Sequence, residues 1–268
     1  MDAQDLQDAA AALLAHRARL RSGPAQAPRG PLPAVSALLP PHWLPADVHA
    51  AYALQDAWIR QAGAVGGWKV GGATAPEPNC APVPARVLVD APDALAWDIA
   101  PGTEFECEIA FTFARDLPAR AQPYTQDEVA AAVGATRPSV ELLAPRFAEQ
   151  QTAGERLAVL ADGLGCGALL LGTSVAGFQE VDCVAQPVQV LADGAVVLER
   201  TGGNAARRLL PLVCWLANHL AQRGQALRAG QTVTTGSWTG QRPWGATREL
   251  RVAFAGIGEV LVRPHRPT

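Results

Sequence analysis

The stretch GTEFECEIAF, Gly102–Phe111, carries the clearest structural pattern in this sequence. Side chains of a β-strand point alternately to its two faces. Phe105, Cys107, Ile109 and Phe111 therefore share one face, and an apolar face of this kind predicts a strand that packs on a hydrophobic core. We expect this strand to lie at the centre of a β-rich unit.

The other face of the same strand carries three carboxylates, Glu104, Glu106 and Glu108, spaced about 7 Å apart along the strand. Like charges so placed repel each other unless a cation lies among them. A hard divalent cation such as Mg²⁺ or Mn²⁺ accepts these oxygen ligands. The solvated face of an edge strand has the same composition, so the pattern alone leaves both interpretations open.

Two further segments contain candidate site residues. SVELL, Ser139–Leu143, places Glu141 in an apolar strand, where a buried carboxylate needs a partner or a metal. GGWKVGG, Gly66–Gly72, places Lys69 among apolar and glycine residues, where an ammonium can stabilise an enolate or move a proton. A glutamate at a strand end and a surface lysine are the plainer alternatives.

Other motifs are weaker. GLGCG, Gly163–Gly167, precedes a strand-like run and opens no helix, so it predicts a tight turn and not a dinucleotide site. TTGSWTG, Thr234–Gly240, has hydroxyl and backbone N–H groups that can hold a small carboxylate, although an ordinary polar turn looks the same. The five histidines are scattered, which argues against a histidine-based nucleophilic triad.

Composition narrows the class of protein. The chain has 268 residues and a net charge of −3, and its length allows a large core without metal or disulfide staples. Its scattered basic residues argue against a nucleic-acid partner. Five cysteines without a CxxC spacing predict reduced thiols and a cytoplasmic location. We expect neither a signal peptide nor a membrane-spanning segment.

The first 67 residues predict a small helical unit. A helix over residues 2–22 is followed by a proline-rich segment, 23–46, and by a second helix from the N-cap Asp47 to about Gln61. The residues of this second helix that we expect to face inward are Val48, Ala51, Tyr52 and Ile59.

Residues 68–268 predict a β-rich core. Helices interrupt it at about 125–133, where Thr125 and Glu128 form a capping box, and at about 210–223. Strands and helices do not alternate regularly, so the predicted class is α+β. The expected strands are Trp68–Val70, Arg86–Leu88, Glu104–Phe113, Ser139–Leu143, Ala168–Leu171, Val188–Leu191, Val196–Glu199, Thr232–Thr235, Glu249–Ala255 and Val260–Val262, with a hairpin joining the sixth and seventh.

Several motifs in this order resemble the 2-keto-4-pentenoate hydratase and 4-oxalocrotonate decarboxylase branch of the fumarylacetoacetate hydrolase superfamily. The resemblance runs from about Ala50 to Val262 and rests on the joint order of the motifs, none of which is decisive alone. The motifs are AYALQ (51–55), GWKVG (67–71), ECEIAF (106–111), the Glu141 strand ending at Arg146, ADG (161–163), GNAA (203–206), WLAN (215–218) and TGS (235–237).

The resemblance implies a β-rich core of the fumarylacetoacetase C-terminal type with a small helical N-terminal unit. It implies Mg²⁺ or Mn²⁺ held by Glu106, Glu108 and Glu141, with Lys69 as the catalytic residue. Glu104 precedes the family motif, and we expect it not to be a metal ligand. The residues expected to bind substrate are Ser237, Asp162 and Arg146.

The activity implied by the resemblance is a metal-dependent hydratase of aromatic-compound degradation. Such an enzyme adds water to a short 2-hydroxydienoate or 2-oxo-enoate, and we expect a small 2-oxo acid substrate and a homo-oligomer. A 2-oxo-enedioate decarboxylase, an acylpyruvate-type C–C hydrolase and a metal- or ligand-binding relative without turnover are the alternatives.

Three segments depart from the family pattern. The stretch at 76–82 reads as a loop without the usual aspartate, and Glu77 is its nearest acidic residue. Ala144-Pro145-Arg146 replaces Asp-Ser-Arg, and Asp162-Gly163 replaces Asp-Asn. These changes concern proton transfer and substrate recognition more than metal binding.

Overall fold

The computed structural model of the protein describes residues 1–21, 32–72, 76–90, 94–97, 99, 102–148 and 152–264. The predicted helices are confirmed, and Asp47 caps its helix by accepting a hydrogen bond from the Ala50 N–H. Thr125 and Glu128 form the expected capping box. The helices are α1 (Ala3–Arg21), α2 (Val48–Ala62), α3 (Gln126–Ala132), α4 (Ala153–Ala161) and α5 (Leu209–Gln222), with short 3₁₀ helices η1 (Val35–Ala37), η2 (Pro41–Trp43) and η3 (Ala85–Val87).

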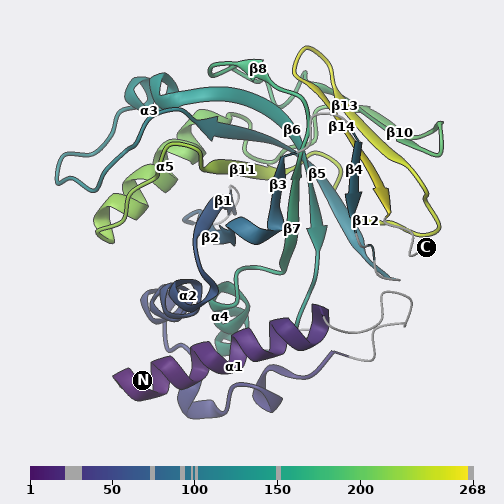
Figure 1. Ribbon diagram of the computed structural model, residues 1–268. Coiled ribbons are helices and arrows are strands. Elements are labelled where there is room, and N and C mark those ends of the chain that lie inside the picture. Colours follow the sequence, from purple (N-terminus) through teal and green to yellow (C-terminus); the bar gives the residue numbers. More distant parts are fainter. Residues whose placement is uncertain are drawn as a thin grey trace.

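The largest element is a curled nine-stranded sheet with the order β2-β1-β11-β5-β6-β7-β3, to which β12 and β8 add at β5 and β6. In Figure 1, α1, α2 and α4 gather below this sheet, while α3 and α5 lie beside it. The strands of this sheet are β1 (Val65–Gly71), β2 (Asn79–Pro84), β3 (Leu88–Asp90), β5 (Glu104–Phe113), β6 (Val133–Leu143), β7 (Cys166–Leu171), β8 (Val175–Ala176), β11 (Thr232–Ser237) and β12 (Arg242–Pro243).

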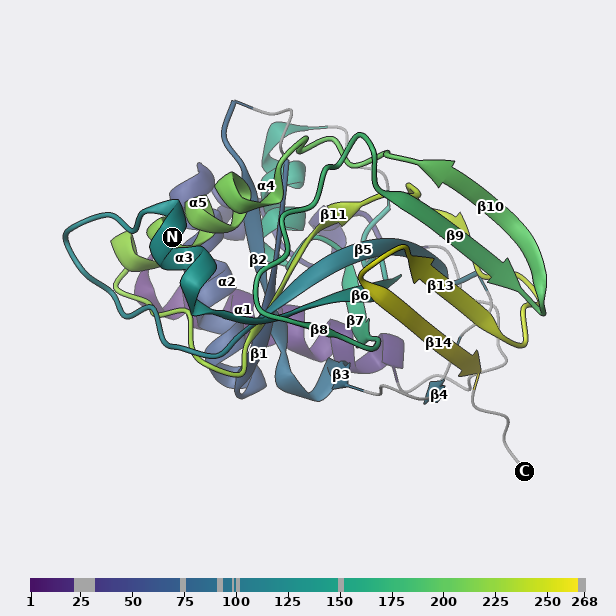
Figure 2. The same cartoon turned by 90° about the horizontal axis from the view of Figure 1, so that it is seen from above.

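A second sheet of five strands, in the order β10-β9-β13-β14-β4, lies to one side of the first (Figure 2). The predicted hairpin joins β9 to β10 through Asp193 and Gly194, which both have positive φ, as the favoured two-residue turn requires. The strands of this sheet are β4 (Ala94–Trp97), β9 (Pro187–Ala192), β10 (Ala195–Thr201), β13 (Leu250–Phe254) and β14 (Gly258–Pro264).

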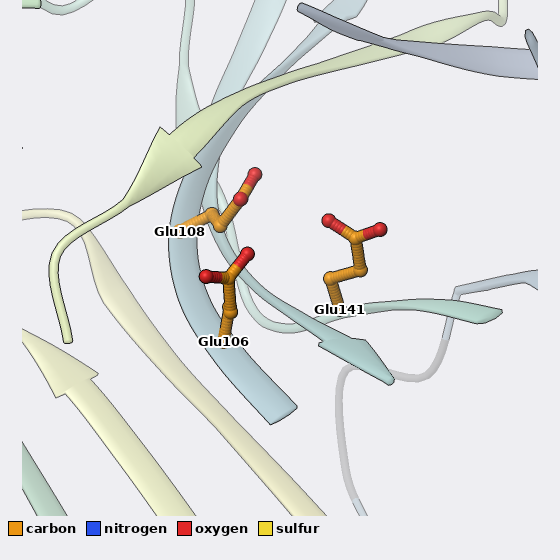
Figure 3. A group of neighbouring side chains, drawn as sticks. All are labelled: Glu106, Glu108 and Glu141. Atoms are coloured by element: carbon orange, nitrogen blue, oxygen red, sulfur yellow. The ribbon is translucent and has the colours of Figure 1, made fainter. Parts of the chain in front are cut away.

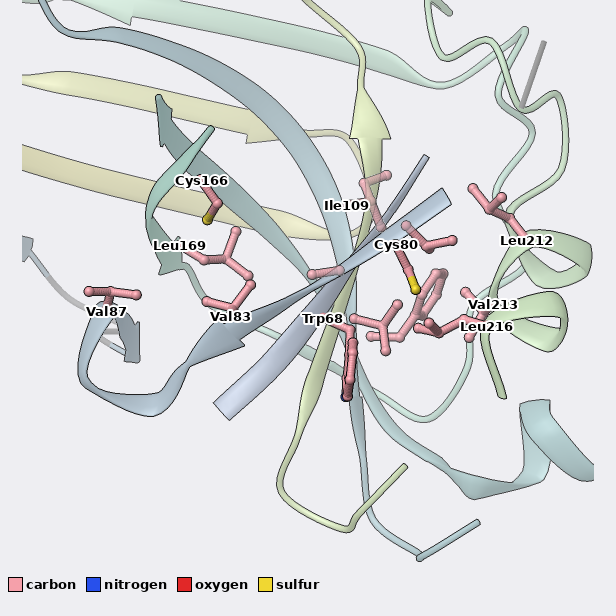
Figure 4. Close-up of a cluster of buried hydrophobic side chains, with 14 of the residues drawn as sticks. Trp68, Cys80, Val83, Val87, Ile109, Cys166, Leu169, Leu212, Val213 and Leu216 are labelled. Carbon is pink, nitrogen blue, oxygen red and sulfur yellow. The ribbon is translucent and has the colours of Figure 1, made fainter. Parts of the chain in front are cut away.

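Strand β5 lies inside the large sheet, between β11 and β6. The edge-strand interpretation of its carboxylate face is therefore wrong. Its other face is buried as expected, and Figure 4 shows Ile109 and Trp68 in one apolar cluster with residues of α5. Packing on this side fixes which way the alternating carboxylates of β5 point, because the two faces of a strand cannot exchange without a shift of register.

The structure corrects the prediction of a loop at 76–82. Residues from Asn79 onward form β2, which pairs antiparallel with β1 at the edge of the large sheet. Pro82 and Pro84 lie within β2, and an edge strand tolerates proline because one side of its backbone needs no ladder partner.

Three smaller predictions also need correction. The first two residues of the expected strand Arg86–Leu88 belong to η3, and the strand itself begins at Leu88. Val48 is 51% exposed, because it begins the first turn of α2. Helix α4 was not expected, although Thr152 and Glu155 form the same kind of capping box as the one that opens α3.

No helix in the described part of the chain is both long and apolar enough to cross a bilayer. The proposed boundary between residues 1–67 and 68–268 stays a prediction. Strand β1 begins at Val65, just before that boundary, and α2 contacts α4 across it.

Candidate metal centre

The register of four strands brings the candidate residues onto one face of the large sheet. Glu106 and Glu141 are direct cross-strand partners on β5 and β6. Lys69 of β1 pairs with Thr234 of β11, which in turn pairs with Ala110 of β5. Since residues two apart on a strand share a face, all these side chains project from the same side of the sheet.

The three carboxyl groups converge, and we call Glu106, Glu108 and Glu141 the carboxylate cluster. One oxygen of each lies within 4.8 Å of one oxygen of the others. Figure 3 shows Glu106 and Glu108 rising from β5 and Glu141 from β6 toward a common space. The alternative of a water-facing Glu141 is wrong, because that residue is 0% exposed.

Lys69 lies next to this cluster rather than on the surface. Its Nζ is 2.6 Å from Glu141 Oε1 and donates to the Leu164 carbonyl oxygen at 3.3 Å. No acceptor for the third N–H is present among the described residues. Burial by itself lowers the pKa of the ammonium, but Glu141, Cys166 and Glu108 outweigh burial and raise it, so Lys69 is a cation at neutral pH.

Burial and mutual repulsion act on the carboxylate cluster. Burial, followed by the charge of Glu141, raises the pKa of Glu106. The same two causes raise the pKa of Glu108 to about 8, against the opposing effects of Lys69 and Thr234. Three carboxylates against one ammonium leave an excess of negative charge, which disfavours the fully ionised state until a further cation neutralises it.

The hydrogen bonds of the cluster are incomplete. Glu108 Oε2 accepts from the Thr234 hydroxyl and from the Gly236 N–H at 3.2 Å. Glu141 Oε2, in contrast, is buried without a hydrogen-bond partner in the described residues. Leaving a carboxylate oxygen in this state is costly. Oxygen donors in this arrangement fit a hard divalent cation.

Ser237, expected at the substrate, lies at the end of β11 opposite Glu108. Its hydroxyl accepts a hydrogen bond from the Thr239 N–H at 3.3 Å. The amide of Asn204 donates to the carbonyl groups of Thr235 and Gly236, which fixes the backbone before Ser237. The turn is thus held in place beside the carboxylate cluster.

Asp162 and Arg146 form a second, separate group of buried charges together with Arg17, which we call the arginine network. Arg17 Nε donates to Asp162 Oδ1 at 2.9 Å, and Arg146 Nε donates to Asp162 Oδ2. Arg146 also donates to the carbonyl groups of Ala144, Cys166 and Asp162. Four of its five N–H groups are therefore occupied by its own chain.

A pocket of about 210 Å³ borders the arginine network and Glu104, which precedes the carboxylate cluster on β5. Its lining includes Arg146 and Asp162, the turn residues Leu164 and Gly165, and Glu104. Leu164 has a φ of 56°, which is rare for a leucine, and its carbonyl group accepts the Lys69 hydrogen bond. The turn predicted at 163–167 is confirmed, and its Leu164 both accepts the Lys69 hydrogen bond and lines this pocket.

Four supporting residues were not predicted as site residues. Thr234, Asn204, Leu164 and Arg17 hold or border the candidate groups through contacts between segments far apart in the chain. The partial signals were the hydroxyl-rich stretch at 234–240, the glycine-rich turn at 163–167 and the motif at 203–206. Glu77, the nearest acidic residue of the altered segment, is exposed.

Comparison with known sequences supports the resemblance that the motifs indicated. No family model matches the chain. A 4-oxalocrotonate decarboxylase of Pseudomonas putida is 29% identical over 136 residues, which is 51% of this chain and 51% of that protein. The 2-keto-4-pentenoate hydratase 2 of Dechloromonas aromatica (strain RCB) is 26% identical over 233 residues, which is 80% of this chain and 85% of that protein. The resemblance inferred from the motifs is confirmed.

A solved structure extends the comparison to the whole chain. The 4-oxalocrotonate decarboxylase from Pseudomonas putida G7, complexed with magnesium and adipate, superposes with a TM-score of 0.77 at 20% identity and covers 99% of both chains. This likeness shows the fold. The α+β class with a core of the fumarylacetoacetase type is therefore confirmed.

Proposed function

We propose that the protein is a divalent-metal-dependent hydratase that adds water to a short 2-hydroxydienoate or 2-oxo-enoate. The observation that carries the proposal is the carboxylate cluster, whose three oxygens lie within 4.8 Å of one another beside Lys69. The similarity to a 2-keto-4-pentenoate hydratase over most of both chains supports the same reaction class.

Glu106, Glu108 and Glu141 are the proposed ligands of Mg²⁺ or Mn²⁺. The buried Glu141 Oε2 without a partner supports this assignment, because a cation would satisfy it. The bound ion supplies Lewis-acid stabilisation of negative charge on the carboxylate and 2-oxo or enol oxygens of the substrate. Thr234 and the Gly236 N–H orient Glu108 for this role through their hydrogen bonds.

Lys69 is the proposed catalytic residue. Its ammonium lies beside the cluster, and one of its N–H groups has no acceptor among the described residues. It can therefore stabilise an enolate oxygen and donate a proton when the enol becomes the ketone. Once the carboxylates are neutralised by a cation, they raise the pKa of Lys69 less, and the ammonium gives up its proton more readily. Lys69 is also the only lysine among the 268 residues, whereas the remaining 21 basic residues are arginines.

The pocket beside Leu164 is the proposed site for the rest of the substrate. Asp162 and Arg146 contribute to its wall, although the arginine network already engages most of their polar groups. Ser237 is the proposed contact for the carboxylate end, since it lies opposite Glu108 at a turn with backbone N–H groups. A homo-oligomeric state stays a prediction.

The decisive experiment follows the ultraviolet absorbance of a 2-hydroxydienoate. Purified protein with Mg²⁺ should abolish the dienoate band, and EDTA should prevent the loss. Glu106→Gln should stop turnover, whereas Glu199→Gln, on the exposed strand β10, should not. An unchanged band with protein of verified metal content, together with retained oxalate binding, would leave a ligand-binding protein as the better interpretation.

Decarboxylation of a 2-oxo-enedioate is the second candidate. The similarity to 4-oxalocrotonate decarboxylase, at 29% identity over half of each chain, favours it. Release of CO₂ from such a substrate, measured beside water addition to the dienoate, separates the two reactions.

A further inference from the structure

The pocket beside Leu164 begins where the carboxylate cluster ends. The pair Glu104 and Leu143 follows the pair Glu106 and Glu141 along β5 and β6 on the same face, one step of about 7 Å further. Both Glu104 and Leu143 line the pocket. A 2-oxo acid held at the carboxylate cluster would therefore extend its carbon chain into this pocket. This placement of the ligand rests on the function proposed above.

Half of the ten residues that line the pocket have apolar side chains. Five of its lining residues, Leu143, Pro145, Phe147, Val159 and Leu164, offer hydrocarbon surface. The volume of about 210 Å³ is below the range of roughly 300–1,000 Å³ that is typical of pockets for drug-sized ligands. The space thus suits a tail of a few carbon atoms.

The charges of the pocket offer no good partner to an anionic tail. Arg146 is the one cation among the described residues that line it, and four of its N–H groups are committed to Asp162, Ala144 and Cys166. The Arg146 guanidinium therefore cannot form a bidentate ion pair with a second carboxylate of the substrate.

Glu104 adds an opposing charge. Its side chain is half-buried at the start of β5, and no hydrogen bond or ion pair engages it in the described part of the chain. A tail carboxylate would meet this unpaired negative charge in a partly desolvated pocket, where like charges repel more than in water. An uncharged tail meets no such penalty.

We propose that the pocket selects 2-oxo acids with a short, uncharged tail over dicarboxylic ones, and that Glu104 is a specificity-determining residue. The substrate class is then a monocarboxylic 2-oxo-enoate. Such a preference would distinguish this chain from a protein whose substrate carries a carboxylate at each end, although both can have the same fold.

The test uses two ligands with the same five-carbon chain, 2-oxopentanoate and 2-oxoglutarate, which differ only in a terminal methyl or carboxylate group. Calorimetry on the Mg²⁺-loaded protein should give 2-oxopentanoate the higher affinity, by at least about tenfold. Glu104→Gln should narrow this ratio, and Glu104→Lys should reverse it. The matched control Glu199→Gln, an exposed glutamate of β10, should leave the ratio unchanged.

Oxalate serves as a probe of the metal end alone. If oxalate binds in a Mg²⁺-dependent way but 2-oxoglutarate binds as well as 2-oxopentanoate, the selection by Glu104 is wrong and the proposed function stands. A ratio that neither Glu104 variant moves has the same meaning. If oxalate does not bind at all, the proposed function and this inference fall together.

Discussion

The carboxylate cluster and the arginine network are both buried groups of charges, but they are satisfied to different degrees. In the arginine network, each Asp162 oxygen and its carbonyl group accept from a guanidinium. In the carboxylate cluster, Glu141 Oε2 has no donor in the described residues, and three acids share one ammonium. Buried charges saturated by their own chain hold a fold together, whereas unsatisfied ones mark where something else binds.

The largest expected effect is the loss of turnover when Lys69, the ammonium beside the carboxylate cluster, is replaced. Lys69→Met should lower turnover by roughly 10²–10⁴-fold, the range for a positioned acid–base group, because the charge on the enolate develops in the transition state. Mg²⁺ and oxalate binding, measured by calorimetry, should persist. Lys69→Arg keeps the charge but holds its proton too tightly to donate it, so it should recover little activity. Near-normal turnover of Lys69→Met would remove Lys69 from the mechanism.

Breaking the arginine network should instead lower the stability of the fold. Asp162→Asn leaves Arg17 and Arg146 buried without their carboxylate, so the free energy of unfolding should fall by roughly 3–5 kcal/mol. Urea denaturation measures this change. Asp8→Asn, an exposed aspartate on the same helix as Arg17, is the control and should change stability by about 0.5 kcal/mol or less. A small effect of Asp162→Asn would contradict its structural role.

Mg²⁺ bound at the carboxylate cluster should stabilise the folded protein. Mg²⁺ at about 100 times its dissociation constant should raise the free energy of unfolding by about 2.7 kcal/mol, and EDTA should reverse the gain. Thermal unfolding measures both. Glu106→Gln should abolish the gain, whereas Glu104→Gln, two residues away on the same strand face, should keep it. Equal losses from both variants would show that the ligands are assigned to the wrong pair.

An effect confined to one pH range is expected for Glu108→Gln without metal. The pKa of Glu108 is raised from 4.5 to about 8, so its contribution to stability is present below about pH 4.5 and is lost as the pH rises toward 8. Glutamine keeps the acceptor for Thr234 and removes this titration. In EDTA, the variant should lose less stability than wild type between these pH values, and an unchanged pH profile would argue against the assignment.

Much of the fold followed from local patterns. The alternation at 104–111, the capping box at Thr125 and the Asp-Gly turn at 193–194 each specify an element within a few residues. The segment at 76–82 shows the limit, because Pro82 and Pro84 break most strands and are tolerated only at an edge. No local pattern says which strand is the edge.

The sequence by itself determined that three carboxylates share a strand face and that the opposite face is apolar, because side-chain alternation is a property of the backbone. The resemblance to a family pointed to Glu141 and Lys69. Only the tertiary structure decided that β5 lies inside the sheet, that Glu141 stands opposite Glu106, and that Asp162 and Arg146 satisfy each other. These facts depend on register and on contacts between distant segments, which follow from the packing of the whole chain.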